Sequence, residues 1–159
     1  MKIETDDPRR SDVRLLLSEH LAEMFATSPP ESVHALDAEA LAVPGITFYS
    51  ARDDDGLLLG CGALREFAPV QGEPKQGELK SMRTTAAARG RGVASALLTR
   101  ILAEARSRGY ASVSLETGVE DYIEAARRLY ERHGFVRCAP FAAYTDDPNS
   151  VYLRLPLAA

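Results

Sequence analysis

The stretch from Gly77 to Arg108 constrains the fold of this chain more than any other. Its first part predicts a β-strand, because alternate side chains of a strand point to opposite faces. The two predicted faces are Leu79, Ser81 and Arg83 on one side, and Glu78, Lys80 and Met82 on the other. Its last part predicts an amphipathic helix that ends at Gly109. The apolar stripe of this helix comprises Val93, Ala94, Leu97, Leu98, Ile101, Leu102 and Ala105. The stretch therefore predicts a strand, a turn and a helix in succession.

The turn of this unit, Arg89-Gly90-Arg91-Gly92, is suited to binding phosphate. The first turn of a helix has backbone N–H groups without intrahelical partners, and the helix macrodipole places partial positive charge there. Glycines remove the Cβ atoms that would keep an anion away from those amides. Arg83, Arg89 and Arg91 add positive charge with forked donors. The turn therefore predicts a phosphate or pyrophosphate site, although an ordinary strand–helix turn fits the same residues equally well.

Two other glycine-rich phosphate motifs do not fit this turn. A Walker A loop needs Gly-Lys-Ser/Thr, which does not follow here. The dinucleotide fingerprint G-x-G-x-x-G fails because Ser95 occupies the position of its third glycine. A P-loop is therefore excluded, and a dinucleotide-binding oxidoreductase is disfavoured.

A second motif lies further along the chain. Residues 111–116 alternate as a strand, and a helix is predicted from about Tyr122 to His133, followed by Gly134-Phe135. The segment ARRLYERHGF, residues 126–135, resembles the signature A-x-x-L-Y-x-x-x-G-F of the GNAT N-acetyltransferase superfamily. The turn at residues 89–94 resembles the acyl-CoA pyrophosphate loop of the same superfamily, R/Q-x-x-G-x-G/A.

Because the two motifs occur in family order and at family spacing, the chain is identified as a member of the GNAT superfamily. Five shorter stretches resemble one bacterial subgroup, the YsnE-like GNAT proteins. They are SPPESVHALD, CGAL, GELKSMRT, LETG and DPNSV.

The remaining elements complete the order expected of this family. They are a strand at residues 1–5, a helix at 13–26, a short helix within 32–41, a hairpin of strands 46–52 and 57–66, and a final strand at 151–155. Gly60-Cys61-Gly62, inside the second hairpin strand, predicts a bulge or a close backbone approach. The resemblance implies a single domain over residues 1–159 with the α/β GNAT (acyl-CoA N-acyltransferase) fold. In that fold a mixed, mostly antiparallel central sheet is splayed between its fourth and fifth strands and carries helices on both faces.

The composition disfavours several other classes of protein. A formal net charge of −4 and a sequence pI near 5.4 argue against nonspecific nucleic-acid binding. Cys61 and Cys138 are too few and too far apart for a disulfide framework or a zinc site, so both are expected to be free. The aspartates at 53–55 predict a hairpin turn with Gly56 rather than a metal site. No apolar run reaches the length of a membrane span and no signal peptide is evident, so the expected location is the cytoplasm.

The resemblance also implies a cofactor, acetyl-CoA, with CoA as the product. The main chain of Met82, Arg83 and Thr84 would pair with the pantetheine arm and the acetyl carbonyl, as an added strand pairs with a sheet edge. Backbone amides at the glycine turn would hold the pyrophosphate. These amides belong to Arg89, Gly90, Arg91, Gly92, Val93, Ala94 and Ser95. The chain departs from many family members at Ile123, where they carry an asparagine that contacts the cofactor.

Three residues are candidates for the chemistry of acetyl transfer. Tyr130 matches the family tyrosine near the CoA sulfur, where a phenol can act as general acid, and the motif favours this role over the alternative of a core aromatic residue beside Leu129 and Phe135. Glu78 on the central strand is the first candidate for the general base, and Glu116 on the neighbouring strand is the second. Carboxylates at strand ends are also common ion-pair partners, so neither assignment is decided by the sequence.

The resemblance also indicates residues that would wall the acceptor site. In GNAT proteins the connection after the first helix helps to wall that site, which makes Glu31 and His34 candidates, with a solvated loop as the alternative. The leading hypothesis is direct transfer of acetyl, in a ternary complex, to a primary amine of a small molecule, which is a simple amine or an amino-acid-like compound. A protein or peptide N-acetyltransferase and a catalytically idle acyl-CoA-binding regulatory module are the alternatives. No nucleic-acid or membrane partner is expected, and the resemblance allows a homodimer.

Overall fold

The computed structural model describes residues 1–157, except for the side chain of Tyr122. The strands are β1 (Lys2–Thr5), β2 (Ile46–Arg52), β3 (Leu58–Glu66), β4 (Gln76–Thr84), β5 (Ser112–Gly118), β6 (Val136–Arg137) and β7 (Ser150–Pro156). The helices are α1 (Ser11–Thr27), α2 (Ala38–Leu41), α3 (Val93–Ser107) and α4 (Glu124–Arg132). Short 3-10 helices occupy Pro30–Ser32, Ala86–Ala88 and Asp121–Ile123. This succession confirms the order of elements that the sequence predicts.

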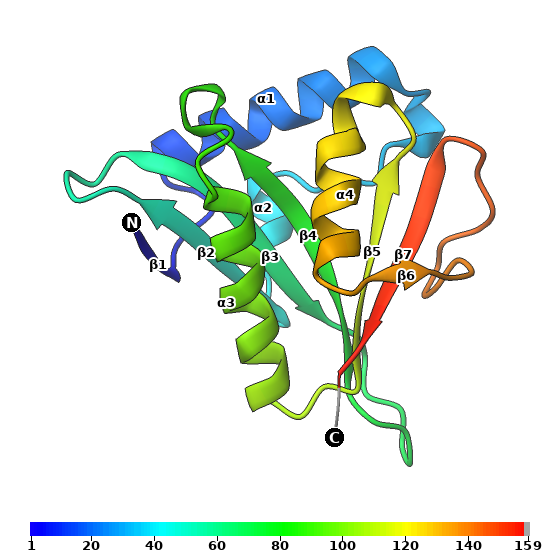
Figure 1. Ribbon diagram of the computed structural model, residues 1–159. Helices are drawn as coiled ribbons and strands as arrows, with labels where there is room; N and C mark the ends of the chain where they lie inside the picture. Colours follow the sequence, from blue (N-terminus) through cyan, green and yellow to red (C-terminus); the bar gives the residue numbers. More distant parts are fainter. Residues whose placement is uncertain (158–159) are drawn as a thin grey trace.

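The strands form one sheet in the order β1-β2-β3-β4-β5-β7-β6 (Figure 1). Every neighbouring pair is antiparallel except β4 and β5, which run parallel. Parallel neighbours need a crossover connection, and α3 supplies it between β4 and β5. The predicted fold class, a mixed and mostly antiparallel sheet, is therefore confirmed.

Helices cover both faces of the sheet, and each face has its own core. Val13 and Leu17 of α1 pack with Leu41 of α2 against Phe48 of β2 and Cys61 of β3. On the opposite face, the predicted apolar stripe of α3 packs against the sheet together with the α4 side chains, so α3 and α4 lie on the other side of the sheet from α1 (Figure 1). Burial of these two apolar surfaces is the main stabilising contribution to the fold.

The sheet opens between β4 and β5. These strands pair at only three positions, from Gln76↔Ser112 to Glu78↔Ser114. Beyond them β4 continues to Thr84 and β5 to Gly118, each paired only with its outer neighbour. The inner edges of both strands thus carry backbone donors and acceptors without a strand partner. This confirms the predicted splay between the fourth and fifth strands.

A bulge in β4 lies at the start of the opening. Cys61 of β3 pairs with Arg83 and Ala63 pairs with Lys80, so one residue of β3 faces two residues of β4. One of those two, Ser81, has a φ of 57°, which is uncommon for a residue with a side chain. The irregularity predicted at Gly60-Cys61-Gly62 is therefore present. A Cβ at Gly60 would lie 2.8 Å from the carbonyl oxygen of Arg83, so the two strands approach closely there.

The bulge makes the predicted faces of this strand wrong. Met82 packs with Leu79 into the core under α3, instead of facing away from it. Arg83 points to the other face, where it forms an ion pair with Glu23 of α1. The extra residue shifts the alternation by one position, so every side chain after the bulge changes face.

The free cysteines and the aspartate turn agree with the predictions from the sequence. Cys61 and Cys138 are free thiols. The aspartate run forms a turn in which an Asp53 side-chain oxygen accepts hydrogen bonds from the amides of Asp55 and Leu57. Within residues 1–157 no three or more His, Cys, Asp or Glu side chains gather as metal ligands would. None of the described helices has both the length and the apolar character that a membrane crossing requires.

Candidate active site

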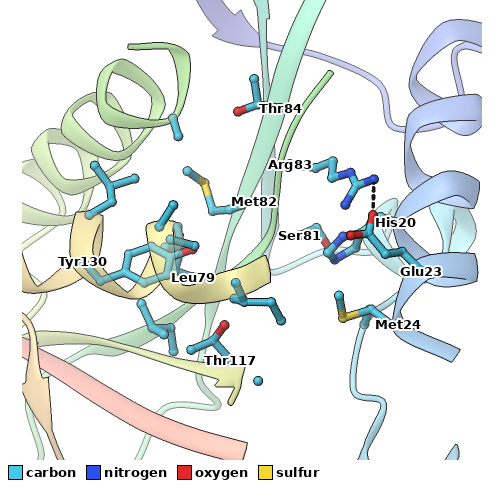
Figure 2. Close-up of a pocket in the computed structure, with 18 of the residues that line it drawn as sticks. His20, Glu23, Met24, Leu79, Ser81, Met82, Arg83, Thr84, Thr117 and Tyr130 are labelled. Carbon is cyan, nitrogen blue, oxygen red and sulfur yellow. Dashed lines mark ion pairs between the residues drawn. The ribbon is translucent and has the colours of Figure 1, made fainter. Parts of the chain in front are cut away.

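A cavity of about 510 Å³ occupies the opening between β4 and β5 (Figure 2). Its wall includes residues of α1, β4, β5, the first turn of α3 and α4. Most of the site residues predicted from the sequence line it. They are Met82, Arg83, Thr84, Arg89, Gly90, Gly92, Val93, Ala94, Ser95, Glu116, Tyr130 and His34. Three predicted residues, Glu31, Glu78 and Arg91, are not part of the lining.

The glycine turn has the geometry of an anion site. Gly90 and Gly92 have φ angles of 76° and 80°, and a Cβ on either would meet no atom within 4 Å. Gly92 caps α3, and its carbonyl accepts the helical hydrogen bond from Ala96. The amides before Ala96 therefore have no partner inside the helix. Arg89 and Arg91 are exposed and form no ion pair within the described part of the chain, so their charge is available to a ligand.

The inner edge of β4 leads from this turn into the centre of the molecule. Met82, Arg83 and Thr84 lie beyond the last pair with β5, so their backbone groups on that edge have no strand partner. An extended ligand can pair with such an edge as an additional strand would. The turn and the edge together form one continuous wall for a long ligand with an anionic end.

Tyr130 reaches the cavity from α4 (Figure 2). Its side chain packs edge-on against Phe135 with ring centroids 5.8 Å apart, and the residue is 7 % exposed. Its hydroxyl makes no hydrogen bond to any described residue. Burial raises the pKa of the phenol, so the group stays protonated at neutral pH. Tyr130 is thus a core aromatic residue whose protonated phenol belongs to the cavity wall.

Glu78 lies in a hydrogen-bonded group behind the cavity. It is 1 % exposed, and its Oε2 accepts a hydrogen bond of 2.6 Å from the Tyr144 hydroxyl. Lys80 Nζ lies 3.3 Å from the same oxygen and donates to the Tyr144 hydroxyl at 2.9 Å. Burial and the bond to Glu78 raise the pKa of Tyr144. Tyr144 stands in an irregular segment 66 positions away from Glu78, and no motif of the sequence connects the two.

Glu116 is the candidate carboxylate that lines the cavity. It accepts a hydrogen bond of 2.7 Å from the Ser150 hydroxyl. Burial raises the pKa of Glu116, and the hydrogen bond from Ser150 together with the nearby charge of Lys80 partly offsets that rise. A carboxylate with a raised pKa holds a proton more readily than an exposed one, which suits a proton acceptor.

The α1 side of the cavity carries polar residues that the sequence analysis did not identify. Arg83 and Glu23 form an ion pair of 2.6 Å between β4 and α1. His20 lies beside them, and burial together with the charge of Arg83 lowers the pKa of its imidazole to about 4. Helical spacing places His20 and Glu23 on one side of α1, but nothing in their spacing indicates that this side meets β4.

The two predicted acceptor residues differ in position. His34 lies at the cavity, where its ring contacts Tyr144 edge-on with centroids 4.9 Å apart. Glu31 belongs to the 3-10 helix after α1 and is exposed. Only His34 is therefore near the residues described above.

Comparison with known proteins gives consistent results. The sequence model of the acetyltransferase (GNAT) family matches residues 13–135. The uncharacterised N-acetyltransferase YsnE of Bacillus subtilis is 49 % identical over 96 % of this chain and 97 % of its own length. A protein of Azospirillum brasilense named IAA acetyltransferase is 38 % identical over 89 % of this chain and 86 % of its own length.

Solved structures have the same architecture. A Klebsiella pneumoniae protein provisionally assigned as an acyl-CoA N-acyltransferase superposes with a TM-score of 0.74. It is 27 % identical, and the alignment covers 99 % of this chain and 97 % of that one. The fold and the relatives agree with the resemblance that the two motifs of the sequence indicate.

Acid sensitivity tests the environment of His20. Its pKa of about 4 lies below the ordinary value of 6.5, so the unfolded chain binds the additional proton first as the pH falls. The free energy of unfolding should therefore fall by about 3 kcal/mol between pH 7 and pH 4 on account of this residue. Urea unfolding at both pH values should show a correspondingly smaller loss in His20→Gln. An equal loss in both proteins would contradict the buried, neutral imidazole.

Proposed function

This chain belongs to the GNAT acetyltransferase family, and we propose that it transfers an acetyl group from acetyl-CoA to a primary amine of a small molecule. The observation that carries the proposal is the cavity in the splay. It extends from the glycine turn, past Tyr130, to polar residues on the α1 side of β4. A donor entering at the turn and an acceptor entering from α1 would meet beside Tyr130.

The residues present fit the acyl-CoA donor that the family uses. The open glycines and unpaired amides at the start of α3 suit a pyrophosphate, with Arg89 as a nearby cation. The free edge of β4 suits the amide groups of a pantetheine arm. Ile123 lines the cavity as well, so the wall is apolar where many family members have asparagine. Acetyl-CoA supplies a thioester whose acetyl carbon is open to attack by an amine.

We assign Tyr130 as the general acid. Its phenol is protonated, faces the cavity and has no competing hydrogen bond among the described residues. It can therefore donate its proton to a thiolate leaving group as negative charge develops there.

The proposed general base is Glu116, with Glu78 as a positioning residue. This reverses the order that the sequence suggested, because Glu78 is fully buried and its Oε2 is already engaged by Tyr144 and Lys80. Glu116 lines the cavity and can accept a proton from the acceptor amine, directly or through water. Glu78 would act through Lys80, which it holds at the cavity wall.

Direct transfer in a ternary complex is supported by the positions of the thiols. Neither cysteine lines the cavity, and burial raises the pKa of the Cys61 thiol to about 12. A thiol of that pKa is a poor acyl carrier at neutral pH, because the thiolate is the nucleophile. The acetyl group therefore passes to the amine without a cysteine-bound stage.

Other acceptors are alternatives to a small-molecule amine. A protein or peptide N-terminus is the first of them. IAA is assayed as well, because the Azospirillum relative is named IAA acetyltransferase. An idle acyl-CoA-binding module would need neither Tyr130 nor Glu116. The two variants below separate an enzyme from such a module.

The first variant removes the proposed acid. In Tyr130→Phe, kcat should fall about 100-fold, because general acid catalysis contributes roughly 10²- to 10⁴-fold. The dissociation constant of acetyl-CoA should change little, because only the hydroxyl is lost. Tyr110→Phe makes the same chemical change at a buried tyrosine outside the cavity lining and should leave kcat as it is. Full activity in Tyr130→Phe would contradict the assignment.

The second experiment compares the two carboxylates. The raised pKa of Glu116 predicts that kcat/KM rises with pH through a value above that of an ordinary glutamate. Glu116→Gln should lower kcat/KM about 100-fold and remove this acid limb of the pH profile. Glu78→Gln should keep the limb. The opposite pattern would make Glu78 the base.

A further inference from the structure

Polar side-chain atoms without a hydrogen-bond partner gather on the α1 side of the cavity. Among the described residues, the buried atoms of this kind are His20 Nδ1, Ser81 Oγ, Arg83 Nε, Tyr110 Oη and Glu120 Oε2. All of these residues except Tyr110 line the cavity. Figure 2 shows His20, Ser81 and Arg83 close together between β4 and α1.

Such a group needs an explanation. Buried polar atoms are nearly always hydrogen-bonded, because leaving one unpaired costs the full loss of its hydration. Three neighbouring exceptions belong to residues that line one cavity, and although the atoms themselves have almost no exposed surface, small rotations of these side chains would present them to a ligand. Ser81 is 9 % exposed and the Arg83 side chain 13 %, so both would hold that ligand away from bulk solvent.

Three of the four unpartnered atoms at the cavity can donate hydrogen bonds, whereas the fourth, Glu120 Oε2, is a carboxylate oxygen. Arg83 Nε and the Ser81 hydroxyl can both donate. The imidazole of His20 is neutral at pH 7, and Nδ1 donates in one of its two tautomers. An anion with two acceptor oxygens, such as a carboxylate, suits three neighbouring donors of which one belongs to a guanidinium.

Glu23 uses only part of the hydrogen-bonding capacity of Arg83. Its Oε2 contacts one terminal nitrogen of the guanidinium at 2.6 Å, and the group has five donors in all. The ion pair fixes the plane of the guanidinium and leaves the Nε side without a partner. Glu23 thus orients Arg83 while leaving donors for a second carboxylate.

The bulge in β4 explains why these residues face the same way. Without the extra residue, Arg83 would lie on the α3 face with Leu79. The bulge instead turns Arg83 toward α1, and it holds Ser81 at a φ of 57°. A residue with a side chain in this region is strained, and such strain is concentrated at functional sites.

Resting on the proposed function, we infer that the acceptor carries a carboxylate beside its amine, held by Arg83, Ser81 and His20. The acceptor class is thus an amino acid rather than a simple amine. The amine of this acceptor faces Glu116, which lies on β5 across the opening from these donors. The cavity of about 510 Å³ must also take the acyl end of the donor, which limits the acceptor to a small molecule.

Matched pairs of acceptors test the inference. Release of free thiol from acetyl-CoA is measured with L-methionine, L-leucine and L-phenylalanine, and with the amines obtained by removing the carboxyl group of each. At least one amino acid should exceed its matched amine in kcat/KM by about tenfold to about a hundredfold, as expected for a charge-assisted hydrogen bond to a carboxylate. Equal or faster turnover of every amine would overturn the inference and leave the proposed function intact.

Substitutions then identify the residues that cause the preference for an amino acid over its matched amine. Arg83→Gln retains the backbone of β4 and should reduce the ratio of the two kcat/KM values by about tenfold or more, with a smaller reduction in Ser81→Ala. The ratio is independent of the fraction of folded protein, so partial destabilisation does not affect it. Arg89→Gln, in the glycine turn, is the matched control: it should raise the KM for acetyl-CoA equally with both members of a pair. An unchanged ratio in Arg83→Gln would overturn the assignment.

If no amino acid and no amine of any pair is acetylated, the inference is overturned, and so is the amine acceptor of the proposed function. Binding of acetyl-CoA, measured in the same samples by calorimetry, distinguishes that failure from a failure of the donor site. Retained binding would locate the error at the acceptor, and lost binding would locate it at the cofactor.

Discussion

The early end of the pairing between β4 and β5 is the constraint on which the rest of the site depends. A sheet that continued its hydrogen bonds would bury both strand edges and leave no space at its centre. Here the pairing stops after Glu78↔Ser114, and the cavity occupies the space that opens. The core under α3 and α4 includes residues from strands on both sides of the opening and so joins the two parts of the sheet, while a second core lies under α1 and α2 on the other face. The free edges that result are costly for an isolated protein and useful for one that binds an extended ligand.

Because of the bulge at Ser81, β4 has side chains with different surroundings on the two faces of the sheet. Leu79 and Met82 pack into the core beneath α3. Arg83, after the bulge, points to the other face and forms an ion pair with Glu23 of α1. In the proposed function, one strand would thereby supply a backbone edge for the donor and the Arg83 side chain for the acceptor. Lys80, Glu78 and Tyr144 form a second polar group nearby, in which each member is hydrogen-bonded to the others.

The parts of this arrangement that could be predicted from the sequence are those encoded locally. The glycine turn, the stripe of α3 and the motif around Tyr130 depend on short-range periodicity and on residues that few other structures require. The face of Arg83 depends on the register between β3 and β4, which no local pattern records. Tyr144 contacts Glu78, and α1 contacts Arg83, only because the fold brings distant segments together. No local sequence pattern therefore indicated a role for His20, Glu23 or Tyr144. The order of the two candidate bases changed for the same reason, since burial of Glu78 is a tertiary property.

The central claim is that the opening between β4 and β5 binds acyl-CoA. The most direct test is thermal unfolding of the protein in the presence of acetyl-CoA, CoA, NAD or ATP. A ligand at 100 times its dissociation constant stabilises the folded state by about 2.7 kcal/mol, which is readily seen as a higher midpoint. We expect both CoA compounds to raise the midpoint and NAD and ATP to leave it unchanged. A midpoint that neither CoA compound raises would contradict the donor site, and the roles proposed for Tyr130 and Glu116 would fail with it.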